Sequence, residues 1–369
     1  MKDLPGTVAS TKVQVLEEVS MIIGGLDVHR AQVTFDYIDT DTGEVCRGQI
    51  QPATRQSFRR WLGARFQGRL DVQLAVEGCT GWRYLVEEMQ RAGIEAHLAE
   101  PADTAAQRGR KKRAKTDRLD AKLLRELLSQ GRLPESWIPP AHVLEARTRA
   151  RTYLALAEQR RRWLQSIQAQ LYHEGVPRVE SLRTHQGRDL LARAELSGAG
   201  REKVEMLLEL IVALDCKLQV LKSQIERLAR ALPGPRALDR LYGVGPLTAV
   251  VIWAEMGDCR RFKRSDQAVR LSGLDVTVWS SDSKRAAGHL AKQGSPALRW
   301  ALYEAAMCAA REGSPDHAYY KSVKDRLKGK RAAISVARKL ARMCYHILRE
   351  LGEQAMAPAD CPVTQVSAA

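Results

Sequence analysis

The sequence contains no apolar run of about 18 or more residues, and this absence excludes a transmembrane helix. Its seven cysteines are odd in number, scattered and free of any Cys-x-x-Cys pair. This usage argues against a zinc site and favours a reducing cytosol. Residues 1–20 are polar and lack the apolar centre of a signal peptide. We therefore expect a cytoplasmic protein with no membrane partner.

Positive charge is in clear excess. The chain of 369 residues carries 59 Lys and Arg against 43 Asp and Glu, which gives a formal net charge of +16. The pI of about 9.7 points to a polyanionic partner, most simply nucleic acid. A ribosomal or membrane-surface role is the plainer alternative. Hydrophobic residues make up 44% of the chain, enough for two or three domains with sizeable cores.

Four carboxylates stand out from the rest of the sequence. Asp27 lies within an apolar, strand-like run and Glu77 ends another, and an acid is costly to bury there unless it is paired or binds a metal. Asp117 and Asp120 are three residues apart in a helical pattern, after Thr116 as a candidate N-cap, so they share one face. Four oxygen ligands on a basic chain predict a site for two Mg²⁺ ions in phosphodiester chemistry. Surface acids, turn formers or helix-dipole partners are the alternatives.

The N-terminal pattern alternates strands and helices. Apolar runs predict strands at 22–28, 32–38, 44–50, 70–76 and 94–98, with a helix at 81–92. This order occurs in ribonuclease-H-like folds and in many other α/β domains. A basic run then precedes Asp117, and it either contacts a phosphate backbone or is a solvated loop. Its charged residues are Arg108, Arg110, Lys111, Lys112, Arg113 and Lys115.

The middle of the chain is helical. Residues 141–173 form an Arg-rich helical stretch, and a second covers about 201–231. Apolar residues in the second stretch alternate steps of three and four, which predicts a coiled-coil seam. They are Val204, Leu207, Ile211, Leu214, Leu218, Leu221, Ile225 and Leu228. The seam can pair with the first long helix, with another subunit or with both.

The last part of the chain offers two further candidate sites. Gly243-Val-Gly245 resembles a helix–hairpin–helix turn that lets backbone N–H groups approach a DNA phosphate, although ordinary helix connections are also glycine-rich. A serine-rich stretch at 280–283 is followed by cations that could stabilise a phosphoryl transfer, although a polar loop is the simpler interpretation. The cations are Lys284, Arg285, His289, Lys292 and Arg299.

Five blocks of sequence together resemble one family. They are Leu26-Asp-Val-His29, Val76-Glu-Gly78, Lys115-Thr-Asp-Arg-Leu-Asp-Ala121, Gly243-Val-Gly-Pro-Leu-Thr248 and Gly288-His-x-x-Lys-Gln-Gly-x-x-x-Leu-Arg-Trp-Ala-Leu302. In this order they resemble the DEDD transposases of insertion sequences, which are recombinases guided by a bridge RNA. The resemblance covers roughly residues 21–350.

The resemblance implies a fold in several parts. A RuvC-like, ribonuclease-H-like α/β domain would occupy 21–138, with Mg²⁺ held on Asp27, Glu77, Asp117 and Asp120. A helical coiled-coil region at 139–232 would lead to a mainly α-helical transposase domain at 233–352 with a helix–hairpin–helix-like turn. The residues outside the resemblance predict a polar extension at 1–20 and a flexible tail at 353–369.

The resemblance also implies a mechanism. Ser281 would attack a DNA phosphate, forming a 5′-phosphoserine link while a 3′-OH leaves, and strand exchange between donor and target DNA would follow. The family shows Ser-Gly at this point where this chain has Ser281-Asp282, so Ser280 is the second choice. A non-coding bridge RNA would pair with both DNAs, and the enzyme would be a homo-oligomer, from dimer to tetramer, in the bacterial cytoplasm at the nucleoid.

Two other functions remain open. The same four acids could serve a junction-resolving nuclease of RuvC type, in which water replaces the serine as nucleophile. A non-catalytic nucleic-acid-binding scaffold could retain the acids without using them. Binding to DNA should weaken steeply with salt in all three cases.

Overall fold

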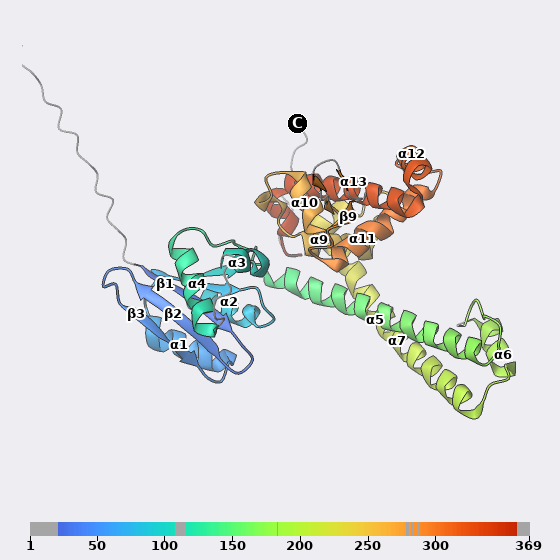
Figure 1. Cartoon of the computed structure of the whole chain (residues 1–369), viewed down its shortest axis with the longest axis horizontal. Helices are drawn as coiled ribbons and strands as arrows, with labels where there is room; N and C mark the ends of the chain where they lie inside the picture. The colour runs from blue at the N-terminus through green and yellow to red at the C-terminus, as the bar shows by residue number, and fades with distance from the viewer. Residues whose placement is uncertain are drawn as a thin grey trace, which may run out of the picture. The chain divides into compact units, whose positions relative to one another are not determined.

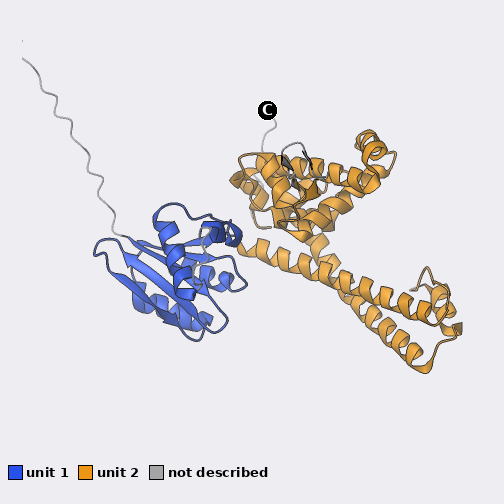
Figure 2. Cartoon of the chain, in the orientation of Figure 1, with its two compact units in different colours: residues 1–138 blue, residues 139–369 orange. Residues whose placement is uncertain are grey.

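The computed structural model describes residues 21–107, 116–182, 184–277, 280–281, 284–285 and 288–359, with the backbone alone at 277, 280–281 and 284–285. The chain divides into two compact units, residues 1–138 and 139–369 (Figure 2). Each unit is described by itself. None of the helices in the described ranges is both long and apolar enough to cross a membrane.

Unit 1 is built on a five-stranded mixed sheet (Figure 1). Its strands are β1 (Ile22–Val28), β2 (Val33–Asp39), β3 (Val45–Ile50), β4 (Val72–Glu77) and β5 (Glu95–Ala99), in the order β3-β2-β1-β4-β5. The first three strands form an antiparallel meander, and β4 and β5 run parallel to β1. All five predicted strands are confirmed, with boundaries that shift by no more than two residues.

Helices pack against the sheet of unit 1. They are α1 (Arg55–Phe66), α2 (Trp82–Arg91), α3 (Pro101–Gln107) and α4 (Asp117–Ser129). One core cluster joins α1 and α2 to strand residues such as Leu26 and Leu74. Another joins α4 to Ile23 and Ala75. Because neighbouring strand residues point to opposite faces, these two clusters lie on the two sides of the sheet.

Unit 2 is mainly helical, as predicted. Its helices are α5 (Ala141–His173), α6 (His185–Arg193), α7 (Gly198–Ala231), α8 (Pro233–Leu238), α9 (Pro246–Met256), α10 (Ser265–Leu271), α11 (Pro296–Met307), α12 (His317–Leu327) and α13 (Gly329–Glu350). Helices α5 and α7 lie side by side with α6 between them in the chain (Figure 1). Ile167 and Leu171 of α5 pack with Val204 and Ile211, which belong to the predicted seam of α7. That this seam forms a coiled coil remains a prediction.

The remainder of unit 2 surrounds a buried helix. Every residue of α9 from Ala249 to Met256 is buried, and α11 and α13 pack against it. The stretch between α10 and α11 contains only two-residue strands, at least in its described part. These are β6 (Val276–Thr277) paired with β9 (His289–Leu290), and β7 (Ser280–Ser281) paired with β8 (Lys284–Arg285).

Candidate metal centre and nucleic-acid interface

Helix α4 lies directly against β1 at Gly25. A Cβ atom on Gly25 would stand 2.1 Å from the Ala121 carbonyl oxygen and 2.6 Å from the Arg125 backbone nitrogen. A side chain larger than hydrogen therefore cannot be accommodated without moving α4. Asp27 lies two residues further along β1 and so faces the same side. Gly25 thus sets the distance between Asp27 and the start of α4.

A buried ion pair holds α4 in the same place. Arg125 Nε lies 2.6 Å from Asp36 Oδ1, and only 10% and 3% of the two side chains are exposed. Asp36 pairs with Gly25 across β1 and β2, and it also accepts a hydrogen bond from Arg47 at 2.7 Å. Thr116 caps the first turn of α4 with its side chain, as predicted. The helix therefore starts at a fixed point above the sheet.

Three side chains converge at the end of β1. His29 Nε2 lies 3.1 Å from Asp27 Oδ2 and 3.3 Å from Asp117 Oδ1. One ligand atom from each residue lies within 4.8 Å of the other two. Gln32 donates a hydrogen bond to the other Asp117 oxygen at 3.1 Å. The fold thus brings together two acids that are far apart in the sequence.

The electrostatics around Asp27 disfavour its negative charge. Burial is the largest cause that raises the pKa of the Asp27 carboxyl above its ordinary value. His29 opposes the increase, while the negative charges of Asp117 and Asp120 add to it. Asp120 therefore lies close enough to act on Asp27, although it is outside the three-residue group. A cation bound among these acids would relieve their mutual repulsion.

Glu77 lies on the neighbouring strand. The parallel pairing of β1 and β4 ends at Leu26 and Val76, and Asp27 and Glu77 follow these paired residues directly. Because paired residues in parallel strands point to the same face, Glu77 belongs to the same side as Asp27. Within the described chain, the three-residue cluster does not include Glu77. Among the described residues, Asp27 and Asp117 therefore share one cluster through His29, while Asp120 and Glu77 lie outside this cluster on the same side of the sheet.

The residues of this cluster fit a divalent cation. Two carboxylates within ligand distance of one another supply the oxygen atoms that Mg²⁺ prefers. His29 stands between them and, when protonated, serves as an internal counter-ion. Its side chain is 55% exposed, so it can turn away or act as a nitrogen ligand. The DEDD arrangement thus suits divalent metal use.

His29 and Gln32 are the contacts that the sequence did not identify as part of the site. His29 follows Asp27 by two residues, and the alternation of side chains along a strand was the available signal. Gln32 contacts Asp117 only because β2 turns back beside β1, and Gln51 then hydrogen-bonds Gln32 at 2.9 Å. No local pattern links residues 32 and 117. Their contact depends on the tertiary fold.

The predicted serine and three of its five predicted cations lie on the short strands of unit 2, while Lys292 follows β9 and Arg299 lies on α11. The backbones of Ser281 and Lys284 pair across β7 and β8. Ser280 and Arg285 also pair there, whereas Asp282 and Ser283 are outside the described residues, as are the six predicted cations between 108 and 115. His289 on β9 and Lys292, at a φ of 53°, are exposed. The Arg299 guanidinium instead donates to the Ser272 carbonyl at 3.0 Å and so also supports the fold.

The two glycines before α9 have different surroundings. Gly243 has a φ of 83°, and a Cβ there would lie 2.5 Å from the Ala305 carbonyl oxygen of α11. Gly245 is the N-cap of α9, and its N–H donates to Thr248 Oγ1 at 2.9 Å. That N–H is therefore not free for a phosphate. Helix packing accounts for Gly243, whereas a Cβ on Gly245 would meet nothing within 4 Å.

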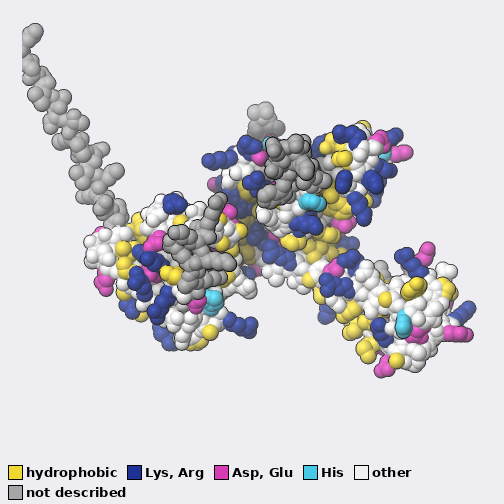
Figure 3. Space-filling model, viewed as in Figure 1, with side chains coloured by type: hydrophobic (Ala, Val, Ile, Leu, Met, Phe, Trp, Pro, Cys, Tyr) yellow, Lys and Arg dark blue, Asp and Glu magenta, His cyan; other side chains and the backbone are white. Residues whose placement is uncertain are grey.

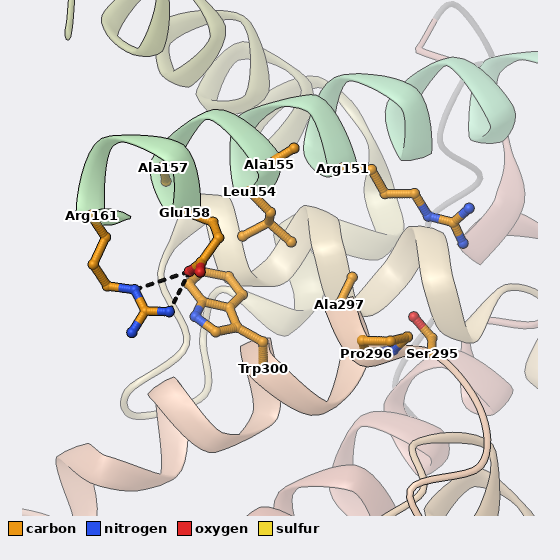
Figure 4. A pocket seen from close by; sticks show the side chains of 10 residues that line it. All are labelled: Arg151, Leu154, Ala155, Ala157, Glu158, Arg161, Ser295, Pro296, Ala297 and Trp300. Carbon is orange, nitrogen blue, oxygen red and sulfur yellow. Dashed lines mark hydrogen bonds and ion pairs between the residues drawn. The ribbon is translucent and has the colours of Figure 1, made fainter. Parts of the chain in front are cut away.

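A cavity of about 650 Å³ lies within unit 2 between α5 and α11 (Figure 4). Its walls are largely apolar, with Leu154 and Trp300 among them. Its charged groups are already paired: Arg161 binds Glu158, and Arg151 binds the buried Glu255 at 2.7 Å. This cavity contains none of the four predicted acids. Elsewhere, Lys and Arg side chains are spread over the visible face of both units (Figure 3).

Two transposase family models match this chain. One is the DEDD transposase family of IS110, which matches residues 24–174 and so includes the whole acid cluster. The other, the transposase family IS116/IS110/IS902, matches residues 236–321 and includes the short strands with Ser281. The first part of the chain is therefore similar to the DEDD domain of IS110 transposases, and the last part to transposases of the IS116/IS110/IS902 family.

Proteins of similar sequence are also named as transposases. One relative is a protein of Sinorhizobium fredii named as the putative transposase y4rJ, to which the chain is 31% identical over 242 residues. The matched region covers 59% of this chain and 60% of that protein. The match thus spans less than two thirds of that relative. A protein of Pseudomonas aeruginosa, named as a family 20 transposase, is 23% identical over 338 residues, across 88% of this chain and 96% of that protein.

Proposed function

We propose that this protein is a DNA transposase that cuts and exchanges DNA strands with Mg²⁺ and a phosphoserine intermediate, guided by a non-coding bridge RNA. The observation that carries the proposal is the convergence of Asp27 and Asp117 under a helix fixed by Gly25. The similarity of both parts of the chain to transposase families supports it. The net charge of +16 fits a protein that handles DNA and RNA together.

The acids of unit 1 would hold the metal. Asp27 and Asp117 would supply the nearest oxygen ligands, with Glu77 and Asp120 completing the set. Bound Mg²⁺ would stabilise the charge that develops on the phosphate being cleaved. Gln32 orients one Asp117 oxygen, which leaves the other toward His29 and Asp27. Gly25 and the Arg125–Asp36 pair keep α4 from moving away.

The serine would carry the covalent step. Ser281 Oγ forms a bond to the phosphorus while the bond from phosphorus to the 3′ oxygen breaks. The serine gives up its proton and the departing 3′ oxygen gains one, so the charges balance. A 3′-OH of the exchanging strand then attacks the phosphoserine and restores the free hydroxyl. Lys284, Arg285, His289 and Lys292 would neutralise phosphates near this position.

Guidance and assembly complete the proposal. The bridge RNA would pair with donor and target DNA, and the basic run at 108–115 would contact their phosphates. The buried seam of α7 packs on α5 in this chain, and we propose it as the coiled coil of a dimer or tetramer.

Trapping the covalent adduct tests the serine claim. The full-length protein is incubated with element-end DNA, its RNA and Mg²⁺, and denaturing electrophoresis detects protein bound to a 5′ end. We expect an adduct that disappears in Ser281→Ala. Adduct formation that survives Ser281→Ala, Ser280→Ala and Ser283→Ala alike would remove the serine from the mechanism.

A second candidate function is a nuclease that uses water as nucleophile. It is favoured by one observation: the whole acid cluster lies within unit 1, so hydrolysis requires no residue of unit 2. This function predicts metal-dependent cleavage without an adduct, at full rate in all three serine variants. Normal binding without cleavage under any metal would instead indicate a scaffold.

A further inference from the structure

A cavity of about 510 Å³ opens within unit 1 beside the acid cluster. Three loops form it: the end of β1, the connection between β3 and α1, and the connection between β4 and α2. His29 lines the cavity and also contacts Asp27 and Asp117, so the two sites share a wall. The lining residues are Val28, His29, Arg30, Ala53, Cys79, Thr80, Gly81 and Tyr84.

The lining is divided between apolar and polar groups. Val28, Ala53 and the ring of Tyr84 offer apolar surface, while Thr80 and Arg30 are exposed polar groups at the rim. Across the residues that the structure describes, Arg30 takes part in no ion pair, and the buried Tyr84 hydroxyl has no hydrogen-bond partner. Because that hydroxyl is shielded from solvent, Tyr84 offers the cavity its ring and not a free hydroxyl. The cavity therefore suits a ligand with a flat apolar ring, polar edges and an adjacent negative charge.

We infer that this cavity receives the base and sugar of one nucleotide of the DNA strand whose phosphate lies at Asp27 and Asp117. The inference rests on the proposed function for the position of that phosphate. In this arrangement the base lies against Tyr84, and Arg30 neutralises the next phosphate along the strand. His29 stands between the base and the cleaved phosphate.

The place of the cavity in the fold favours a nucleotide over other ligands. It lies at the carboxyl ends of the parallel strands β1 and β4, where open α/β sheets bind their ligands. Its volume is that of a small-molecule site, and it needs no rearrangement of the core. An unpaired base stacked on an aromatic ring adds binding free energy whichever base it is. A DNA strand drawn to the acids thus has room for one unstacked base.

Two small ligands isolate the contribution of the base. Thymidine 5′-monophosphate and 2-deoxyribose 5-phosphate carry the same phosphate and sugar, but only the first has a base. Their affinities for the full-length protein are measured by calorimetry with Ca²⁺ present. Thr80→Phe blocks the cavity from its exposed rim, and Thr42→Phe is the matched control at an exposed threonine in the turn between β2 and β3.

We expect wild type and Thr42→Phe to bind the nucleotide about tenfold or more tightly than the sugar phosphate, as stacking of one base provides. In Thr80→Phe this preference should fall to within about twofold, with thermal unfolding unchanged. Equal affinities in wild type, absence of binding, or a preference that survives Thr80→Phe would overturn the inference. A base preference in a protein that never cuts DNA would instead contradict the proposed function alone.

Discussion

On one face of the sheet of unit 1, Glu88 of α2 is buried among arginines, whereas on the other face Asp27 of β1 is buried among acids. Hydrogen bonds from Arg59, and then Arg55, hold the pKa of Glu88 at about 2. Burial and the charges of Asp117 and Asp120 raise the pKa of Asp27 instead. The same fold thus neutralises one buried carboxylate and leaves the other in excess negative charge.

The difference shows which of the two sites is structural. The partners of Glu88 come from α1 and α2, so its charge joins two helices and is satisfied within the chain. Among the described residues around Asp27, His29 is the side chain that favours the ionised carboxylate, and it is 55% exposed. A carboxylate buried beside other acids is costly to maintain and is typical of a functional site. This arrangement suits a bound divalent cation.

The largest expected effect is on cleavage. Asp27→Ala should lower the rate of DNA cleavage by on the order of a thousandfold, because the metal contributes several kcal/mol of transition-state stabilisation. Cleavage of element-end DNA in the presence of Mg²⁺ measures this. Asp41→Ala, at an exposed acid in the turn after β2, serves as the control and should cut at the wild-type rate. Equal rates for both variants would mean that Asp27 is not catalytic.

The contact at Gly25 should have the next largest effect. Gly25→Ala puts a methyl group against the backbone of α4, so we expect a loss of about 3 kcal/mol in the free energy of unfolding and weaker metal binding. Gly63→Ala is the matched control, because Gly63 lies inside α1 with open space around it. It should stabilise the protein by about 0.5–1 kcal/mol. Urea denaturation of both variants gives the comparison, and similar stabilities would refute the close approach.

The structural carboxylate should affect stability without affecting metal binding. Glu88→Gln removes the charge that three arginines share, and we expect it to cost about 2 kcal/mol. The lowered pKa means that ionised Glu88 stabilises the fold above pH 4.5, its ordinary pKa, and that this contribution is lost as the pH falls toward about 2. The stability difference between wild type and variant, followed by denaturation from pH 5 down to pH 2.5, should therefore shrink with falling pH.

The smallest expected effect is a gain in the free energy of unfolding when the charge of Asp27 is removed. The pKa of Asp27 is raised in the folded protein, so the ionised carboxylate opposes folding. The stability that the protonated carboxyl contributes below its ordinary pKa is lost as the pH rises through the pKa of the folded state. Asp27→Asn should therefore raise the free energy of unfolding at pH 7 by on the order of 1 kcal/mol when EDTA removes metals. A loss of stability under the same conditions would show that Asp27 is satisfied by its neighbours.

The sequence predicted what depends on local pattern. The five strands and α4 follow from apolar periodicity and the Thr116 cap. Asp27 and Glu77 were found because they interrupt or end apolar runs, and Asp117 and Asp120 because their spacing puts them on one helix face. Helix α1 was missed, because its many arginines hide the stripe of Phe58, Leu62 and Phe66 that packs on the sheet. The Gln32–Asp117 bond and the Arg125–Asp36 pair were also beyond prediction, since each joins residues that only the folded sheet brings together.

The prediction for Ser281 rests on different support. The acids lie on packed elements of unit 1, so their positions follow from the fold. Ser281 lies on a two-residue strand that is not part of a larger sheet. Its role follows from family resemblance, and the adduct experiment is its test.

Direct titration of a divalent cation tests the central claim. Calorimetry with Mn²⁺ compares the wild-type protein, Asp27→Asn and Glu88→Gln in the absence of DNA. We predict that wild type and Glu88→Gln bind the ion alike, while Asp27→Asn loses the binding. Equal binding by all three proteins would contradict the assignment of the acid cluster as the metal centre.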